Sequence, residues 1–288
     1  MTSSEILKKA QKEKYAVGQF NISTDEQLKA IIQAADELKS PVIIGTSEGE
    51  RGFIGTEQAA VLTKIWQQKT KLPIILNADH CKTIESAKEA IDAGYTAIHF
   101  DGSTLPIEEN IKKTKEIIRY AKSQNPNILI EGELGYLRGS SEIHKEKTEI
   151  KKEDFTTPEE AEEFIQKTKA DSLAIVIGNI HGIDLKNPNP SLDIKRIKQI
   201  KKAIKDTFLV LHGGSGVSKK DIKEAIKQGI VKININTELR IAYSQKLRES
   251  MTSRPDQVKP YKILTPAVEA VKEVVKEKIR LFGSENKA

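Results

Sequence analysis

Three histidines each follow a short apolar run, and their imidazoles could bind a divalent metal ion. His80 ends the segment PIILNADH, His181 ends SLAIVIGNIH, and His212 ends TFLVLH. If these runs are parallel strands of one barrel, their carboxyl ends lie at the same mouth. Three imidazoles at one mouth form a metal site with an open coordination position. The spacing therefore predicts a metal centre made by these three side chains.

The other two histidines and the single cysteine are predicted to lie outside this centre. His99 falls within a predicted strand, where side-chain alternation favours a buried structural role. His144 lies in a polar segment, and we expect its side chain to be solvated. Cys81 is adjacent to His80, and adjacent side chains seldom point at one ion. One cysteine also excludes an internal disulfide, which favours the cytoplasm as the compartment.

The elements that must position these residues alternate along the chain. Apolar, β-branched runs are each followed by a segment of helical period. Continuous apolar runs are typical of a parallel sheet that is covered on both faces. We therefore predict an α/β fold, a (β/α)8 TIM barrel, as a single domain over 1–288. The eight predicted strands are 15–20, 41–46, 73–78, 96–101, 127–134, 172–178, 207–213 and 231–235.

Helix boundaries carry matching signals. Residues 23–25, Thr83 and Ser218 stand where helices should begin, and Gly94 and Gly229 stand where helices should end. Hydroxyl and carboxylate side chains cap helix starts, whereas glycine commonly follows a helix end.

Two segments depart from the alternation. The polar, glycine-bearing stretch at about 136–157 follows the fifth strand and is too long for an ordinary connection. Loops of this length in compact domains are usually functional, so we predict a lid. A further helix at about 266–281 follows the eighth unit, as an extra C-terminal helix.

Composition excludes several classes of function. The 47 basic and 41 acidic residues give a net charge of +6, but the basic ones are spread along helical segments. A nucleic-acid-binding arm would concentrate them, and no binding module accompanies them. No apolar stretch approaches the length of a membrane span, and the amino terminus lacks the apolar core of a secretory signal. A mild positive excess suits an anionic small substrate.

Glycine-rich turns follow the last two predicted strands. The turn HGGSG occupies 212–216, and NINT at 234–237 opens the last barrel helix. Backbone N–H groups and helix amino ends at these two loops hold phosphate in many barrels. We expect a phosphate site here, and the alternative is a tight turn with a helix cap.

The motifs ADH, FDGS, EGELG, IGNIHG, LVLHGGSG and KININTE, one per strand and in this order, resemble the zinc-dependent class II fructose-bisphosphate aldolases. The similarity extends from GQFNIS to KIRLFGSENKA. It implies reversible cleavage of fructose 1,6-bisphosphate to dihydroxyacetone phosphate and glyceraldehyde 3-phosphate in glycolysis and gluconeogenesis. Tagatose-bisphosphate aldolases share most of these motifs, so tagatose bisphosphate or another ketose phosphate is an alternative. A non-catalytic aldolase-like subunit is a third.

The resemblance implies a role for each matching residue. His80, His181 and His212 match the Zn²⁺ ligands, although imidazoles also suit other divalent ions. Asp101 and Glu133 match carboxylates of a second or alternative metal position. The metal would act as a Lewis acid on the charge that develops when the carbon–carbon bond breaks.

Two carboxylates match proton-transfer roles. Asp79 matches the acid/base that handles the C4 hydroxyl proton. The family's lid glutamate for the C3 proton falls at Ser141, and the nearest carboxylate is Glu142. The residues that match the phosphate site, where the family also admits a monovalent cation, are Gly182, Gly213, Gly214, Ser215, Asn234, Ile235, Asn236 and Thr237, with Lys186 later in its loop than the family's lysine.

Other positions leave alternatives open. Asn236 has a counterpart in fructose-type members of the family, whereas tagatose-type members often carry a small apolar residue at this position. Val268 stands where relatives carry an arginine for the second phosphate, and Arg51 or another basic residue is the candidate replacement. Lys232, on the eighth predicted strand, would be the nucleophile of a Schiff-base aldolase. The resemblance also implies that the chain binds a phosphorylated sugar and forms a homodimer or homotetramer. We expect neither nucleic acid nor a membrane as a partner.

Overall fold

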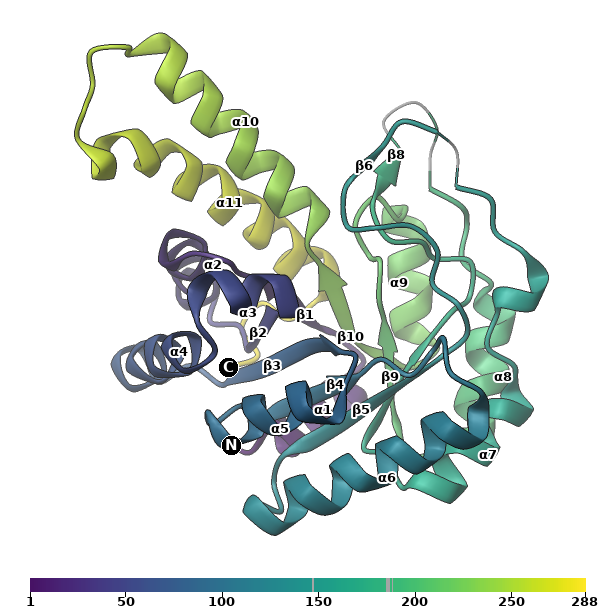
Figure 1. Cartoon of the computed structure of the whole chain (residues 1–288). Helices are drawn as coiled ribbons and strands as arrows, with labels where there is room; N and C mark the ends of the chain where they lie inside the picture. Colours follow the sequence, from purple (N-terminus) through teal and green to yellow (C-terminus); the bar gives the residue numbers. More distant parts are fainter. Residues whose placement is uncertain (147, 185–186, 188) are drawn as a thin grey trace.

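The computed structural model describes residues 1–146, 148–184, 187 and 189–288. Its centre is a closed barrel of eight parallel strands, in the order β1-β10-β9-β7-β5-β4-β3-β2 (Figure 1). Each predicted run overlaps one barrel strand, so the predicted (β/α)8 fold is confirmed. The barrel strands are β1 (Val17–Asn21), β2 (Val42–Thr46), β3 (Ile74–Cys81), β4 (Ala97–Phe100), β5 (Leu129–Leu134), β7 (Ser172–Ile175), β9 (Phe208–Leu211) and β10 (Ile230–Ile235).

A ring of helices covers the outer face of the barrel and buries the strands from outside, which is why the strand sequences are apolar throughout. The predicted caps are confirmed, because the hydroxyls of Thr24, Thr83 and Ser218 accept N–H groups of the first turn of α2, α5 and α9. The ring consists of α2 (Asp25–Glu37), α4 (Thr56–Thr70), α5 (Ile84–Asp92), α6 (Ile107–Gln124), α7 (Pro158–Thr168), α8 (Ile194–Ile204), α9 (Lys219–Lys227) and the carboxyl-terminal half of α11 (Pro260–Phe282), which packs between α9 and α2.

Two short helices complete the two ends of the barrel. Helix α1 (Ser3–Glu13) places Ile6 and Leu7 in one apolar cluster with residues from the amino-terminal halves of the strands. It therefore closes the end of the barrel opposite the predicted site. Helix α3 (Glu48–Ile54) follows β2 directly and lies at the carboxyl-terminal mouth.

Helix α10 (Thr237–Ser253) and the amino-terminal part of α11 form an arm that projects from the barrel (Figure 1). Helix α11 begins earlier than the predicted bound of 266, since Pro266 lies inside it. Proline cannot bond the carbonyl four residues before it. Here that carbonyl, of Lys262, accepts from Arg254 Nη2 at 3.2 Å, so the helix continues through the proline.

The predicted lid contains structure of its own. A short strand, β6 (Ile143–His144), pairs in parallel with β8 (Ile183–Asp184), which follows β7 (Figure 1). A 3-10 turn, η1 (Lys152–Asp154), leads back to α7. At its base, Arg138 donates to Asp154 through Nε at 2.5 Å and Nη2 at 2.9 Å. The pairing of β6 with β8 connects the lid to the loop that carries His181.

Within the described part of the chain, no helix has the length and apolar character needed to cross a membrane. The single-domain extent of 1–288 stays a prediction.

Candidate active site

Strand β3 ends in a bulge that turns two adjacent side chains into the mouth. The register with β4 shifts between Ala78 and Cys81, and His80 has a φ of 50°. In a regular strand, Asp79 and His80 would point to opposite faces, and a bulge removes that alternation. Left-handed backbone at a non-glycine residue costs about 1–3 kcal/mol, so other contacts must hold it. One is the His80 N–H, which donates to His99 Nδ1 at 3.0 Å.

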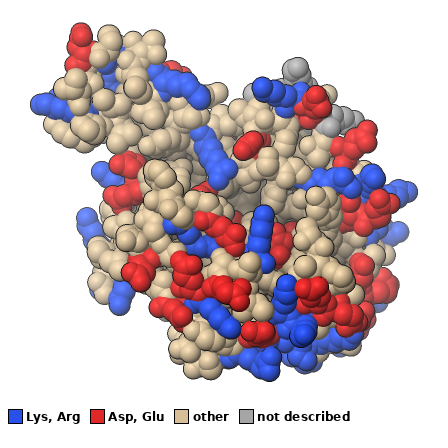
Figure 2. All heavy atoms as spheres, in the orientation of Figure 1, with Lys and Arg blue, Asp and Glu red and all other residues tan. Residues whose placement is uncertain are grey.

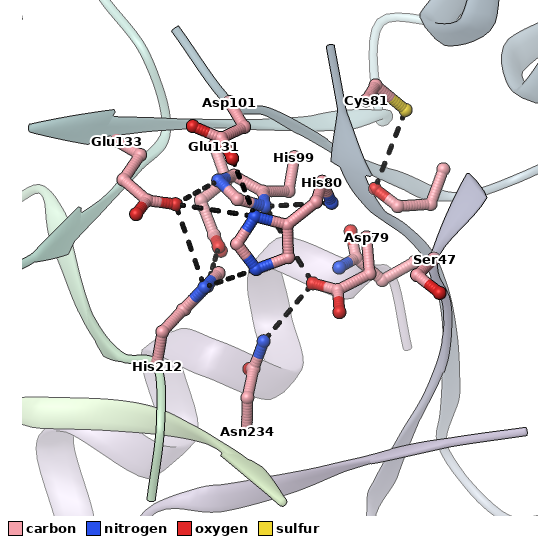
Figure 3. A network of polar contacts seen from close by, with 12 residues as sticks. Ser47, Asp79, His80, Cys81, His99, Asp101, Glu131, Glu133, His212 and Asn234 are labelled. Atoms are coloured by element: carbon pink, nitrogen blue, oxygen red, sulfur yellow. Dashed lines mark hydrogen bonds and ion pairs between the residues drawn. The ribbon is translucent and has the colours of Figure 1, made fainter. Parts of the chain in front are cut away.

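The imidazoles of His80, His99 and His212 point toward one another (Figure 3). Their ring centroids are 4.6 to 4.9 Å apart, and His212 Nδ1 lies 3.1 Å from His80 Nε2. The ring of His181 lies 5.1 Å from that of His80. The structure therefore brings the three predicted ligands to one mouth, with His99 beside them.

Carboxylates complete the cluster. Asp101 Oδ2 is 2.9 Å from His80 Nδ1, and Glu133 Oε2 is 3.7 Å from the same nitrogen. Two sets of ligand atoms lie mutually within 4.8 Å. The first comprises Asp79, His80, His99 and His212, and the second comprises His80, Asp101 and Glu133.

The cluster fits a divalent cation. Imidazole nitrogen and carboxylate oxygen are ligands for zinc and for other transition metals. Glu133 Oε2 and His99 Nε2 are buried 2.9 Å apart, yet neither makes a well-aligned hydrogen bond with the described residues. They form an ion pair with each other, and together with the neighbouring imidazoles they make a donor set of the kind that a divalent cation binds. His181 falls outside both sets, so its role as a ligand stays a prediction.

His99 is closer to the centre than the sequence interpretation placed it. It is fully buried, as expected, but it contacts Glu133 and lies 3.7 Å from Asp79. The signal was present, because residues two apart on a strand share a face, and Asp101 is two residues after His99.

Glu131 supports the cluster from below. It accepts from His212 Nε2 at 3.0 Å and from Lys232 Nζ at 2.8 Å. Since Nε2 carries the proton, Nδ1 of His212 keeps its lone pair for the cluster. Lys232 is 3% exposed and lines the barrel interior together with Leu7 of α1. Its ammonium is bonded below the mouth, which argues against the Schiff-base alternative.

Replacing Lys232 with methionine should lower the free energy of unfolding by about 3–5 kcal/mol, because Glu131 would remain buried without its cationic partner. Urea denaturation would measure this, with the exposed Lys198→Met as the matched control. Trapping of a sugar adduct on the wild-type protein by borohydride would instead support the Schiff-base alternative.

Asp79 is a fixed acceptor between two amides. Its Oδ1 accepts from Asn234 Nδ2 at 3.2 Å (Figure 3), and its Oδ2 accepts from Asn21 Nδ2 at 2.9 Å. Burial alone would raise its pKa, but the charge of His80 and the contact with His99 hold that pKa well below its usual range. Asp79 is therefore ionised at neutral pH, which is the state that a general base requires.

The environment of His181 favours the neutral imidazole. Burial and the positive charge of His80 lower the pKa of His181 to about 3. A neutral ring has a nitrogen lone pair free for a metal. Its backbone carbonyl accepts from His144 Nε2 at 2.6 Å. The expectation of a solvated His144 was therefore wrong, because the strand pairing of the lid brings this ring against the His181 loop.

A cavity of about 280 Å³ adjoins the cluster. A Cβ on Gly213, whose φ is +61°, would lie 2.1 Å from the carbonyl oxygen of Ile180. Only glycine fits this close approach of two loops. The cavity is lined by Asn21, Ser47, Asp79, His80, Ser140, Ser141, Glu142, His181, Gly182, Gly213, Ser215, Asn234, Asn236, Thr237 and Arg240.

Most of the predicted phosphate residues meet at this cavity, but two of the described ones do not. Ile235 is fully buried in the barrel wall, because alternation along β10 turns it away from the cavity. Gly214 uses its N–H to bond the Asn234 carbonyl at 3.1 Å. Lys186 lies outside the described residues. Helix α10 begins at Thr237, so its amino end faces the space where an anion would be favoured.

Neither Arg51, the candidate replacement, nor Val268, which stands where relatives carry an arginine for the second phosphate, faces the mouth. Val268 is buried in α11. Arg51 is 5% exposed, and its guanidinium donates to the carbonyls of Thr46 and Asp79 and to Ser86 Oγ. The arginine that does line the cavity is Arg240, one turn into α10. Sequence reasoning missed it, although its spacing from Thr237 places it on the start of that helix.

Comparisons with known proteins cover the whole chain. The family described as fructose-bisphosphate aldolase class-II matches residues 1–287. A probable fructose-bisphosphate aldolase from Bacillus subtilis (strain 168) is 38% identical over 100% of this chain and 99% of its own length. A 6-phospho-5-dehydro-2-deoxy-D-gluconate aldolase from Bacillus licheniformis is also 38% identical, over 100% and 96%. The crystal structure of the YdjI aldolase from Escherichia coli K12 superposes with a TM-score of 0.82 and 34% identity, over 100% of this chain and 99% of that one.

Proposed function

Since the chain belongs to the class II fructose-bisphosphate aldolase family, whose members are carbon–carbon lyases, we propose that it reversibly cleaves fructose 1,6-bisphosphate. The products are dihydroxyacetone phosphate and glyceraldehyde 3-phosphate, as in glycolysis and gluconeogenesis. One observation carries the proposal, namely that the imidazole cluster, Asp79 and the glycine-lined cavity share one mouth.

In this proposal, His80, His181 and His212 hold a zinc ion or another divalent cation. Asp101 and Glu133 offer a second or alternative position beside His80. When bound, the cation supplies Lewis-acid stabilisation of negative charge on the substrate. Glu131 accepts from His212 Nε2 and so orients this ring with Nδ1 toward the cluster.

The protein's own groups bind the substrate and move protons. Gly182, Gly213, Ser215 and Thr237 surround the phosphate on the ketone side. Asp79 takes the C4 hydroxyl proton during cleavage and returns it during condensation, held in position by its two asparagine donors.

Glu142 is the proposed acid/base for the C3 proton. It is the one carboxylate of the lid segment 140–142, and its exposed side chain lines the cavity. Its neighbour Ser141 is bonded through the carbonyl to Arg240 Nη1 at 2.8 Å, which places the lid against the cavity wall.

The relatives' names define the alternatives for the identity of the sugar. One relative is named for fructose bisphosphate, and another for a phosphorylated keto acid. Both names describe a phosphorylated ketone with a second anionic group at the far end. We therefore retain another ketose phosphate, tagatose bisphosphate included, as the second candidate.

Chelation should abolish cleavage of fructose 1,6-bisphosphate, and added zinc should restore it, because the cluster has no other source of Lewis acidity. Initial rates with tagatose 1,6-bisphosphate in parallel give the sugar preference. Activity that survives chelation would contradict the metal-dependent mechanism. Absence of activity on both sugars would contradict the proposed substrates.

We also propose a homodimer or homotetramer. The free, buried Cys81 suits a reducing compartment such as the cytoplasm.

A further inference from the structure

Arg51 is a cation that the proposed function leaves without a role. Figure 2 shows basic side chains on the surface around the hollow between the arm and the lid. Arg51, on α3, differs from these because it is only 5% exposed. Its guanidinium donates to two backbone carbonyls, to the Ser86 hydroxyl and to the Cys81 thiol. Because burial of a charge is costly, these partners indicate what the side chain stabilises.

The carbonyl partners of Arg51 lie where the ladder between β2 and β3 ends. The register of this parallel pair runs up to Thr46 and Ala78. At this end, Arg51 Nη1 donates to the carbonyl of Thr46 and, at 3.5 Å, to the carbonyl of Asp79. The guanidinium therefore joins the ends of β2 and β3 at the point where the pairing of their backbones stops.

The same guanidinium contacts the far end of the β3 bulge, which runs from Ala78 to Cys81. Its Nη2 lies 3.4 Å from Cys81 Sγ and 3.1 Å from Ser86 Oγ, the latter on α5. One side chain thus contacts the residue on each side of His80, whose backbone is left-handed. A planar fork of five N–H groups holds such acceptors in fixed directions, whereas a lysine ammonium is a point charge.

Helix α3 also holds the chain just after the bulge. Glu48 Oε1, on the same helix, accepts the N–H of Lys82 at 3.0 Å. The Ser47 N–H donates to Glu50 Oε2 at 2.7 Å, as part of a capping box at the start of α3. A capping box fixes the first turn of a helix, so Arg51 projects from a fixed base. One helix therefore contacts the bulge along its length.

We propose that Arg51 is a positioning residue, whose guanidinium maintains the bulge that turns both Asp79 and His80 into the mouth. The inference rests on the proposed function, in which Asp79 moves a proton and His80 binds the metal. A regular strand would send these two side chains to opposite faces and would remove the left-handed backbone at His80. Without the guanidinium, the bulge loses a contact on each side of His80, so regular pairing becomes more favourable.

Hydrogen exchange of the full-length protein, with and without zinc, tests the proposal independently of activity. In Arg51→Met, the amides of segment 79–82 should exchange at least about 10-fold faster relative to those of β7, because the bulge opens locally. Tyr95→Phe is the matched control. The buried Tyr95 hydroxyl contacts Thr46 Oγ1 at 2.8 Å, at the same strand end but through the side chain. This variant should leave the ratio between the two segments unchanged.

The metal site provides a second readout. Arg51→Met should weaken zinc affinity, measured by competition with a chelator, by about 10- to 100-fold, the usual effect of removing an outer contact of a metal ligand. The visible spectrum of the cobalt-substituted protein should also change, since it reports the ligand geometry. Arg51→Lys keeps the charge but not the fork, so its changes should be smaller and in the same direction. This variant serves if Arg51→Met does not fold.

A merely structural role predicts a different pattern. Segment 79–82 and β7 would then exchange faster by the same factor, and the cobalt spectrum would stay unchanged. That result would overturn the proposal, and so would a changed exchange ratio in Tyr95→Phe. If the wild type binds no metal or cleaves no sugar, the proposed function fails, and hydrogen exchange still decides whether Arg51 holds the bulge.

Discussion

Replacing His181 with alanine should abolish turnover and leave the barrel folded. The ring contributes one of the three predicted metal nitrogens, and loss of several kcal/mol of charge stabilisation corresponds to at least about a 10³-fold fall in kcat. The fold should tolerate the change, because the side chain is only partly buried and lies in a loop beyond β7. The contact with His144 uses the backbone carbonyl and survives the substitution.

Three measurements on His181→Ala separate the explanations. Bound zinc per chain and kcat should both fall, and thermal unfolding of the metal-free protein should be unchanged. His144→Ala removes another histidine from the same pair of loops and should retain zinc. If His181→Ala unfolds without any specific change in zinc binding, its role is structural and the predicted ligand set is wrong.

Asp79→Asn should lower kcat by about 10²- to 10⁴-fold, the usual contribution of a positioned acid/base. The substitution preserves shape but removes the proton acceptor. One of the two amide contacts, from Asn21 or Asn234, would then become donor against donor. KM should change little, because the phosphate contacts lie elsewhere in the cavity. Steady-state kinetics of the zinc-loaded variant would measure both constants.

Asp101→Asn is the matched control, since it removes a carboxylate that lies 2.9 Å from the neighbouring His80. Equal losses in the two variants would show that the charge around His80 matters more than proton transfer. Zinc content gives a further distinction, because Asp79 lies within ligand distance of the imidazoles. A loss of bound zinc in Asp79→Asn would make Asp79 a ligand and not the acid/base.

The barrel and its three histidines could be predicted because they depend on local periodicity. Continuous apolar runs with helical segments between them fix the strand order, and barrel geometry then brings strand ends together. The same reasoning put Asp79 and His80 at one mouth, although their adjacency in a strand argues against it. The bulge at His80 turns both side chains to the mouth, and the sequence contains no pattern that would have predicted this bulge.

What could not be predicted depends on contacts between distant segments. Glu50 accepts hydrogen bonds from both Asn21 and Arg240, which are more than a hundred positions apart in the sequence. These contacts form only when α3 packs near the start of α10. His144 contacts the His181 loop because two short strands pair across the lid. The Lys262 carbonyl that Pro266 leaves free in α11 accepts from Arg254, which follows the end of α10. Each depends on long-range geometry, which periodicity does not encode.

The pairing of β6 with β8 makes the lid and the His181 loop a single ribbon. Glu142 immediately precedes one of these strands, and His181 stands two residues before the other. A displacement of either loop must therefore break the backbone bonds between them or carry both residues along. If His181 is a metal ligand, as proposed, we therefore expect any opening of the lid to displace this ligand as well, so that access for the sugar and completion of the ligand set are coupled.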